Sequence, residues 1–235
     1  MRPLAAALLA VGAALTGTAA AAPTLGRSSE GRPIVLARIG PASAEHRLLV
    51  VGCIHGNECA GIPIVRRLLA GPAPAGTAIW AIPDLNPDGT AHNIRQNARG
   101  VDLNRNFPSG WRAYGRRGDL EYAGRRPLSE PESRLAVAAI RRLRPDVTIW
   151  FHQHQDLVRA WGASVPAARR FAALAGLRFR RLVWPSGSAT RWQNRSFPGT
   201  AAFVVELPAG PVPPAQLARY VRAIRILAVE GPRGH

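Results

Sequence analysis

The 235-residue sequence contains no lysine, only 14 acidic residues and only two cysteines. Its formal net charge of +17 therefore rests entirely on arginine. The arginines are scattered along the chain, and no nucleic-acid-binding motif or aromatic interleaving accompanies them, so we expect no specific nucleic-acid partner. A strongly basic surface instead favours polyanionic surroundings or an anionic substrate.

Long apolar runs are confined to the beginning of the chain. A basic start at residues 1–3 precedes an apolar run at 4–15 and a zone of small residues at 16–22. These are the three parts of a secretory signal, and the run is too short to span a bilayer. We expect residues 1–22 to be a signal peptide that is removed, leaving a secreted or cell-envelope protein without a membrane span. An uncleaved membrane anchor is the alternative.

The two cysteines, Cys53 and Cys59, lie on either side of His55. An even number of cysteines in an exported protein favours a disulfide, which would brace the segment between them. The competing interpretation is that the pair binds zinc, but two thiolates beside His55 and Glu58 would crowd one ion with mismatched ligands. We favour the disulfide.

The remaining sequence predicts one α/β domain, residues 23–235. Apolar residues make up 47% and charged residues 19%, which is typical of a globular chain. Apolar strands alternate with helices, a pattern that predicts a mixed, mainly parallel twisted sheet with helices on both faces. Expected strands are 33–38, 48–54, 78–82, 147–151, 179–184 and 201–207, and expected helices are 59–69, 129–143, 166–174 and 214–229. A capping box at 129–132 should open the second helix, and the long irregular region at 90–128 is typical of a functional loop.

Three polar residues, His55, His152 and Glu206, fall at the carboxyl ends of predicted strands, where ligand sites lie in such sheets. His55-x-x-Glu58 follows one strand at a corner that turns both side chains to one point, and His152 follows another. Two imidazoles and a carboxylate are the ligand set of a hydrolytic zinc ion. His154 would point the same way if the strand continued, but His152 directly follows the apolar run and is preferred. Glu206 lies within an apolar strand, where a carboxylate is costly unless it is paired or functional.

Two further segments make the pattern specific. Residues 86–89 read Asn-Pro-Asp-Gly, and residues 100–108 read Gly-Val-Asp-Leu-Asn-Arg-Asn-Phe-Pro. Together with His55-x-x-Glu58, the later strand-end histidine and the Phe-x-x-Glu-Leu strand at 203–207, they resemble the zinc carboxypeptidase family of the carboxypeptidase A and B type. The resemblance runs from about residue 26 to residue 207, nearly the whole of the expected mature chain.

The resemblance implies a zinc-dependent hydrolase that carries one Zn²⁺ per chain and acts on a peptide substrate, with residues 23–235 as its catalytic domain. Its general base would promote attack by water on an amide carbonyl and then deliver a proton to the leaving amine. The residue roles that it implies are metal ligation by His55, Glu58 and His152, general base catalysis by Glu206, oxyanion stabilisation by Arg95, substrate-carboxylate binding by Asn104 and Arg105, and orientation of His55 by Asp102.

Two departures from the family pattern concern the substrate. Residues 177–195 contain no tyrosine, although the family places its substrate-capping tyrosine in this region. Asn57 stands where the pancreatic enzymes carry an arginine that contacts the substrate, so we expect different subsite preferences.

The chain is small and begins with an expected leader. With these features, the sequences of residues 104–108 and 127–132 look most like the bacterial branch that includes murein peptide amidases. The resemblance therefore implies cleavage of the bond between γ-D-glutamate and diaminopimelate, by a monomer. One alternative is a carboxypeptidase that removes ordinary C-terminal residues, with its side-chain pocket near Ser188 to Arg191, where Arg191 would engage an acidic side chain. A second alternative is an inactive protein that binds cell wall, against which the complete set of residues counts.

Overall fold

The computed structural model describes residues 24–233, so the expected leader at 1–22 lies outside the described residues. Strands and helices alternate along the described chain, as the sequence predicts. The strands are β1 (Thr24–Arg27), β2 (Pro33–Val35), β3 (Ala37–Ile39), β4 (His46–Val51), β5 (Thr77–Ile82), β6 (Val147–Gln153), β7 (Leu157–Ala160), β8 (Arg178–Arg181) and β9 (Ala201–Leu207). The α-helices are α1 (Gly61–Leu69), α2 (Pro87–His92), α3 (Pro131–Leu143), α4 (Val165–Ala175), α5 (Ala189–Ser196) and α6 (Pro214–Glu230).

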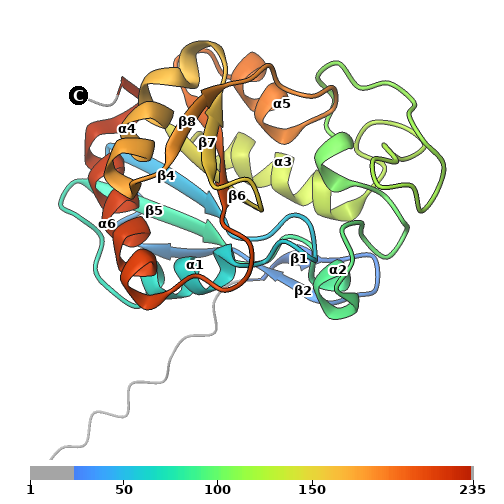
Figure 1. Cartoon of the computed structure of the whole chain (residues 1–235), viewed down its shortest axis with the longest axis horizontal. Helices are drawn as coiled ribbons and strands as arrows, with labels where there is room; N and C mark the ends of the chain where they lie inside the picture. The colour runs from blue at the N-terminus through green and yellow to red at the C-terminus, as the bar shows by residue number, and fades with distance from the viewer. Residues whose placement is uncertain (1–23, 234–235) are drawn as a thin grey trace, which may run out of the picture.

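A seven-stranded sheet of order β3-β5-β4-β6-β9-β7-β8 forms the centre of the molecule, and β1 and β2 form a separate two-stranded sheet. The central strands β5, β4, β6 and β9 run parallel to one another, whereas β3 and β7 run antiparallel to their neighbours β5 and β9. Helices α1, α4 and α6 lie on one side of the sheet, and α3 and α5 lie on the other (Figure 1). The predicted mixed, mainly parallel sheet with two covered faces is confirmed.

The core lies around β6 and β9, because both faces of these strands are covered. Every residue of β9 is buried, and so is every residue of β6 up to His152. Parallel strands covered on both faces read as continuous apolar runs rather than as alternating ones, which is why the sequence reveals them clearly. Among residues 24–233, no helix is both long and apolar enough to pass through a membrane.

Three local features differ from the sequence expectations. The predicted strand at 33–38 is two strands, β2 and β3, separated by Leu36, and they pair with different partners. The segment at 86–89, whose residues favour a turn, instead begins helix α2, with Asn86 Oδ1 accepting a hydrogen bond from Gly89 N at 3.0 Å. The predicted capping box at 129–132 does not form: Glu130 and not Ser129 precedes α3, its side chain makes no capping hydrogen bond, and the Ser129 hydroxyl donates to Glu130 instead.

Strand β7 and helix α5 were not expected from the sequence. Strand β7 has only four residues and reads Leu-Val-Arg-Ala, too short for a clear periodic signal. Helix α5 reads Ala-Thr-Arg-Trp-Gln-Asn-Arg-Ser, and its apolar positions are few. Both elements lie beside β9 and form one side of the cavity described below.

Candidate active site

The carboxyl ends of β4 and β6 bring together the three residues expected to bind metal. The two strands are parallel neighbours, so His55 and Glu58, in the loop after β4, meet His152 near the end of β6. One potential ligand atom from each residue lies within 4.8 Å of the others. His154, the alternative considered for this position, is exposed and is not part of the cluster.

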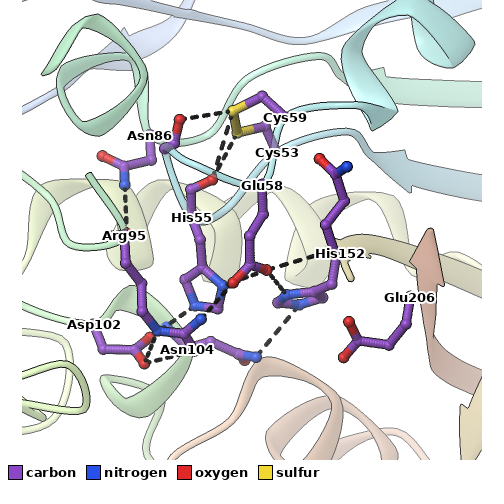
Figure 2. Close-up of polar contacts among 12 residues, drawn as sticks. Cys53, His55, Glu58, Cys59, Asn86, Arg95, Asp102, Asn104, His152 and Glu206 are labelled. Carbon is purple, nitrogen blue, oxygen red and sulfur yellow. Dashed lines mark hydrogen bonds and ion pairs between the residues drawn. A yellow bond between two sulfur atoms is a disulfide. The ribbon is translucent and has the colours of Figure 1, made fainter. Parts of the chain in front are cut away.

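Glu58 is the centre of this cluster. Its Oε2 lies 3.0 Å from Nδ1 of His55 and 3.0 Å from Nδ1 of His152 (Figure 2). Burial raises the pKa of Glu58, but its hydrogen bonds to the two histidines outweigh burial and hold that pKa well below the usual range. Burial lowers the pKa of His152 to about 4, so its imidazole is neutral at neutral pH, the form that binds a metal.

Asp102 fixes the orientation of His55. Its Oδ1 lies 2.9 Å from His55 Nε2, and its Oδ2 accepts hydrogen bonds from Nε and Nη2 of Arg95 at 3.1 and 3.0 Å. Asp102 is fully buried and its ionised carboxylate only accepts, so Nε2 of His55 carries a proton, and a metal would replace the proton that Nδ1 shares with Glu58. Burial opposes ionisation of Asp102, but the charges of His55 and Arg95 hold its pKa far below the usual value.

The loop that carries His55 and Glu58 is held at two points. A disulfide joins Cys53 to Cys59, with their Cα atoms 4.8 Å apart. Gly56 packs directly against the backbone of helix α2, because a Cβ atom at this position would lie 1.9 Å from the carbonyl carbon of Gly89. The absence of a side chain at Gly56 therefore allows the ligand loop to lie directly against α2.

Glu206 lies on β9 directly beside His152 on β6 and is 5% exposed. Figure 2 shows its carboxylate directed toward His152 and Glu58 without a hydrogen bond to either. Its Oε2 is buried without a partner, and Oε1 is 3.7 Å from Nη1 of Arg159. Burial, followed by repulsion from Glu58, raises the pKa of Glu206 to about 7, the range suited to proton transfer at neutral pH.

Asn104 and Arg105 lie in a short 3₁₀ turn on the opposite side of the cavity. Oδ1 of Asn104 accepts a hydrogen bond from Ala189 N at 3.0 Å, which leaves its amide nitrogen as the donor, 3.4 Å from His152 Nε2. Arg105 forms an ion pair with Glu121 and donates a hydrogen bond from Nη1 to the carbonyl of Asn104 at 3.0 Å. Arg105 is therefore paired with a carboxylate of the same chain.

One cavity of about 650 Å³ connects these groups. Its walls carry the three clustered residues, Arg95, Asn104, Arg105 and Glu206. Asn57 and His154 also line it, and Leu120 and Glu121 contribute from the long loop that was expected to be functional. No tyrosine is among the described residues that line the cavity, in agreement with the missing tyrosine of residues 177–195.

Comparison with known proteins decides the family. A family model described as zinc carboxypeptidase matches residues 13–176, more than half of the chain. The chain belongs to the zinc carboxypeptidase family. The matched segment contains His55, Glu58 and His152 and ends before Glu206, whose place beside His152 comes from the sheet register alone. Membership of this family indicates a hydrolase.

Two groups of known proteins are similar in sequence to this chain. Murein peptide amidase A of Escherichia coli K12 is 32% identical over 138 residues, which cover 54% of this chain and 57% of the relative. Carboxypeptidase Z of Rattus norvegicus is 34% identical over 115 residues, which cover 36% of this chain and 18% of the relative. The matched regions thus span a little over half of the amidase and a small part of the carboxypeptidase.

Two solved structures share the fold. The murein-tripeptide amidase MpaA of Escherichia coli O157 superposes with a TM-score of 0.71 at 26% identity, and the superposition covers 91% of this chain and 92% of the other. Carboxypeptidase A of Helicoverpa armigera superposes with a TM-score of 0.73 at 19% identity, covering 88% and 68% of the two chains. The second likeness concerns the fold alone.

The clustered residues of this family member fit a zinc ion by their chemistry. Two imidazole nitrogens and one carboxylate oxygen are the donor set of a catalytic zinc site that leaves a position open for water. Asp102 supplies the carboxylate that a metal-bound histidine uses to fix its tautomer. The open side of the cluster faces the cavity, which also contains the unpartnered carboxylate of Glu206.

Sequence reasoning did not identify Arg159. This residue lies on β7 opposite Val204 of β9, and it lines the cavity. Arg191, expected to contact the substrate, lies on α5 and donates from Nη1 to the carbonyl of Trp184 at 3.3 Å. It is not among the residues that line the cavity. Arg159 was not identified because strand β7 was not predicted. The pairing of β7 with β9 is what directs Arg159 into the cavity.

Proposed function

We propose that this chain is a zinc-dependent peptidase that hydrolyses an amide bond next to a free carboxylate in murein peptides. The observation that carries the proposal is the buried carboxylate of Glu206, whose Oε2 has no hydrogen-bond partner within residues 24–233, in a cavity that also contains the two-histidine, one-glutamate cluster. Family membership supports the peptidase activity. The likeness to murein peptide amidase A, and the similar extent of the amidase structure, support the substrate.

A bound zinc ion would polarise the scissile carbonyl and lower the pKa of a water molecule in its open position. His55, Glu58 and His152 would hold the ion. Glu206 would take the proton from the attacking water through its free Oε2 and give it to the leaving nitrogen. A carboxyl group with a pKa of about 7 is suited to both transfers at neutral pH.

Arg95 and the pair Asn104 and Arg105 would fix the substrate. Arg95 lines the cavity beside Glu58 and Asp102, so its positive charge would stabilise negative charge that develops on the carbonyl oxygen. Asn104 and Arg105 present an amide donor and a guanidinium, which suit the free carboxylate of the terminal residue. The ion pair between Arg105 and Glu121 must open for that carboxylate to bind.

We also propose that residues 1–22 direct export and that the mature domain, residues 23–235, acts in the cell envelope or outside the cell. The leader-like composition of these residues and the disulfide between Cys53 and Cys59 support this location. Expression of the full chain with a reporter enzyme fused to its C-terminus tests it. Reporter activity that stays inside the cell would contradict export.

The activity test compares the wild type with Glu206→Gln, each loaded with one equivalent of zinc. The substrates are a γ-D-glutamyl-meso-diaminopimelate peptide and a blocked dipeptide with an ordinary C-terminal residue. The wild type should release diaminopimelate, and Glu206→Gln should lose at least about 1,000-fold in kcat while it still binds zinc. Loss of zinc in this variant would identify Glu206 as a ligand instead.

The same assay decides between the alternatives. Faster cleavage of the ordinary dipeptide would make the chain a general carboxypeptidase. Zinc binding with no hydrolysis of either substrate would leave a wall-binding protein, and sedimentation with purified murein would then measure that binding. Absence of zinc binding would contradict the proposed function altogether.

A further inference from the structure

The far end of the cavity contains a cation that the chemistry above does not use. Arg159 lines this cavity, and its side chain is 18% exposed. Its Nε is buried without a hydrogen-bond partner, and its Nη1 is 3.7 Å from Glu206 Oε1, beyond hydrogen-bonding distance. Within the described part of the chain this largely buried guanidinium has only the long ion pair with Glu206, which is costly, so its presence here indicates a role in binding.

The sheet register places Arg159 deeper in the molecule than Glu206. Arg159 is directly opposite Val204 on the neighbouring strand, and Val204 precedes Glu206 by two residues on the same face of β9. Glu206 is near the carboxyl end of its strand, where the scissile bond must lie. A group that contacts Arg159 therefore extends from the scissile bond toward the floor of the cavity.

This position matches the side chain of the substrate's terminal residue. If the terminal carboxylate binds Asn104 and Arg105 and the amide carbonyl lies between the metal and Glu206, the side chain is the part of that residue that remains to be accommodated. The remaining lining residues at this end are Arg159, Trp184, Ser188, Thr190 and Val204.

The chemistry of this end favours a side chain that carries a carboxylate. Nε1 of Trp184, like Nε of Arg159, is a buried donor without a partner. The acidic residues that line the cavity are Glu58, Glu121 and Glu206, and the first two are already paired with His55 and Arg105. A basic side chain would be repelled by Arg159, and Glu206, the remaining carboxylate, already lies 3.7 Å from Arg159.

We propose that Arg159 selects substrates whose terminal residue carries a second carboxylate at the end of its side chain. This inference rests on the proposed function, and it deepens that function by naming the chemical class of the terminal residue. Diaminopimelate belongs to this class, because it is lysine with an added carboxylate on the ε carbon. Glutamate is a shorter member, whereas lysine and glutamine are not members.

The test uses substrate pairs that differ by this one group. The first pair is γ-D-glutamyl-meso-diaminopimelate and γ-D-glutamyl-L-lysine, and the second is a blocked dipeptide that ends in glutamate or in glutamine. Each pair is measured with the zinc-loaded wild type, Arg159→Met, Arg159→Lys and Arg191→Met. Arg191 is the matched control, because its Nε is also buried and unpartnered but the residue does not line the cavity.

The readout is the ratio of kcat/KM within each pair. Arg159 also faces Glu206, so its removal will change catalysis on every substrate, and the ratio cancels that common effect. The wild type and Arg191→Met should prefer the carboxylate member by about 10- to 100-fold, because a hydrogen bond between charged groups strengthens binding by about this factor. Arg159→Met should reduce the ratio to within about threefold of one, and Arg159→Lys should give an intermediate ratio.

The outcomes separate this inference from the proposed function. Hydrolysis without a preference for the carboxylate member, or an equal loss of preference in Arg191→Met, overturns the role of Arg159 and leaves the peptidase intact. If no substrate is hydrolysed, titration calorimetry measures the affinity of the wild type and of Arg159→Met for both members of each pair. Equal affinity for both members then overturns the inference, and a preference that only the wild type shows supports it. Circular dichroism checks that each variant is folded.

Discussion

Replacement of Glu206 by glutamine should stabilise the metal-free protein at neutral and alkaline pH. The position raises the pKa of this carboxyl from 4.5 to about 7, through burial first and repulsion from Glu58 second. The folded state therefore binds this proton more tightly than the unfolded state does. The resulting penalty is absent below about pH 4.5, grows as the pH rises through the interval up to about 7, and is complete above it.

The size of this effect follows from the shift. Each unit of pKa corresponds to about 1.4 kcal/mol, so a carboxyl whose pKa rises from 4.5 to about 7 costs about 3 kcal/mol when it is ionised. The side chain is 7% exposed, so solvent screens little of this penalty. Glu206→Gln should thus match the wild type near pH 4.5 and exceed it by about 3 kcal/mol at pH 8.

The measurement is urea unfolding of chelator-treated protein, followed by tryptophan fluorescence between pH 4.5 and 8.5. Glu45→Gln is the control, because Glu45 is exposed, and its curve should follow the wild type. Restored zinc should shrink the gain in Glu206→Gln, since the charge of the ion favours the ionised carboxyl. Parallel pH profiles for the wild type and Glu206→Gln would refute the reasoning.

Three further perturbations concern the surroundings of the cluster. Asp102→Asn should weaken zinc binding about 10- to 100-fold in competition with a chromogenic chelator, and unchanged affinity would contradict the orienting role. Glu121→Gln should lower KM for a substrate with a free carboxylate about threefold or more, because it releases Arg105, and a higher KM would show that the pair assists binding. Gly56→Ala should destabilise the protein by about 1–3 kcal/mol in urea unfolding, because the added Cβ meets the backbone of Gly89, whereas a wild-type midpoint would show that the loop moves aside freely.

The central strands were predictable because strands that are buried on both faces have continuous apolar sequences. Strand β9 was expected at 201–207 and is found at those residues, since both of its faces are covered and every position is apolar except Glu206. Parallel pairing then brings strand ends to one edge, so the meeting of His55, Glu58 and His152 follows from local patterns and one rule of topology.

The part of the cavity around Arg159 was not predictable in the same way. It depends on β7, a four-residue strand whose direction is set by its partner β9 and not by its own composition. The ion pair between Arg105 and Glu121 likewise joins two parts of a long loop, and no periodicity specifies that contact. With several arginines near the site, the choice between Arg159 and Arg191 required the fold.

The strands that carry the cavity residues determine which of these residues could be exchanged when an enzyme with this fold is redesigned. His152 and Glu206 lie on β6 and β9, central strands that are buried along almost their whole length, so a change in either strand disturbs the core. Arg159 occupies a short strand near one edge, joined to β9 and β8 alone. If Arg159 selects the substrate as proposed, exchange of residues 157–160 together with β8 would transfer that selectivity and leave His55, Glu58, His152 and Glu206 in place.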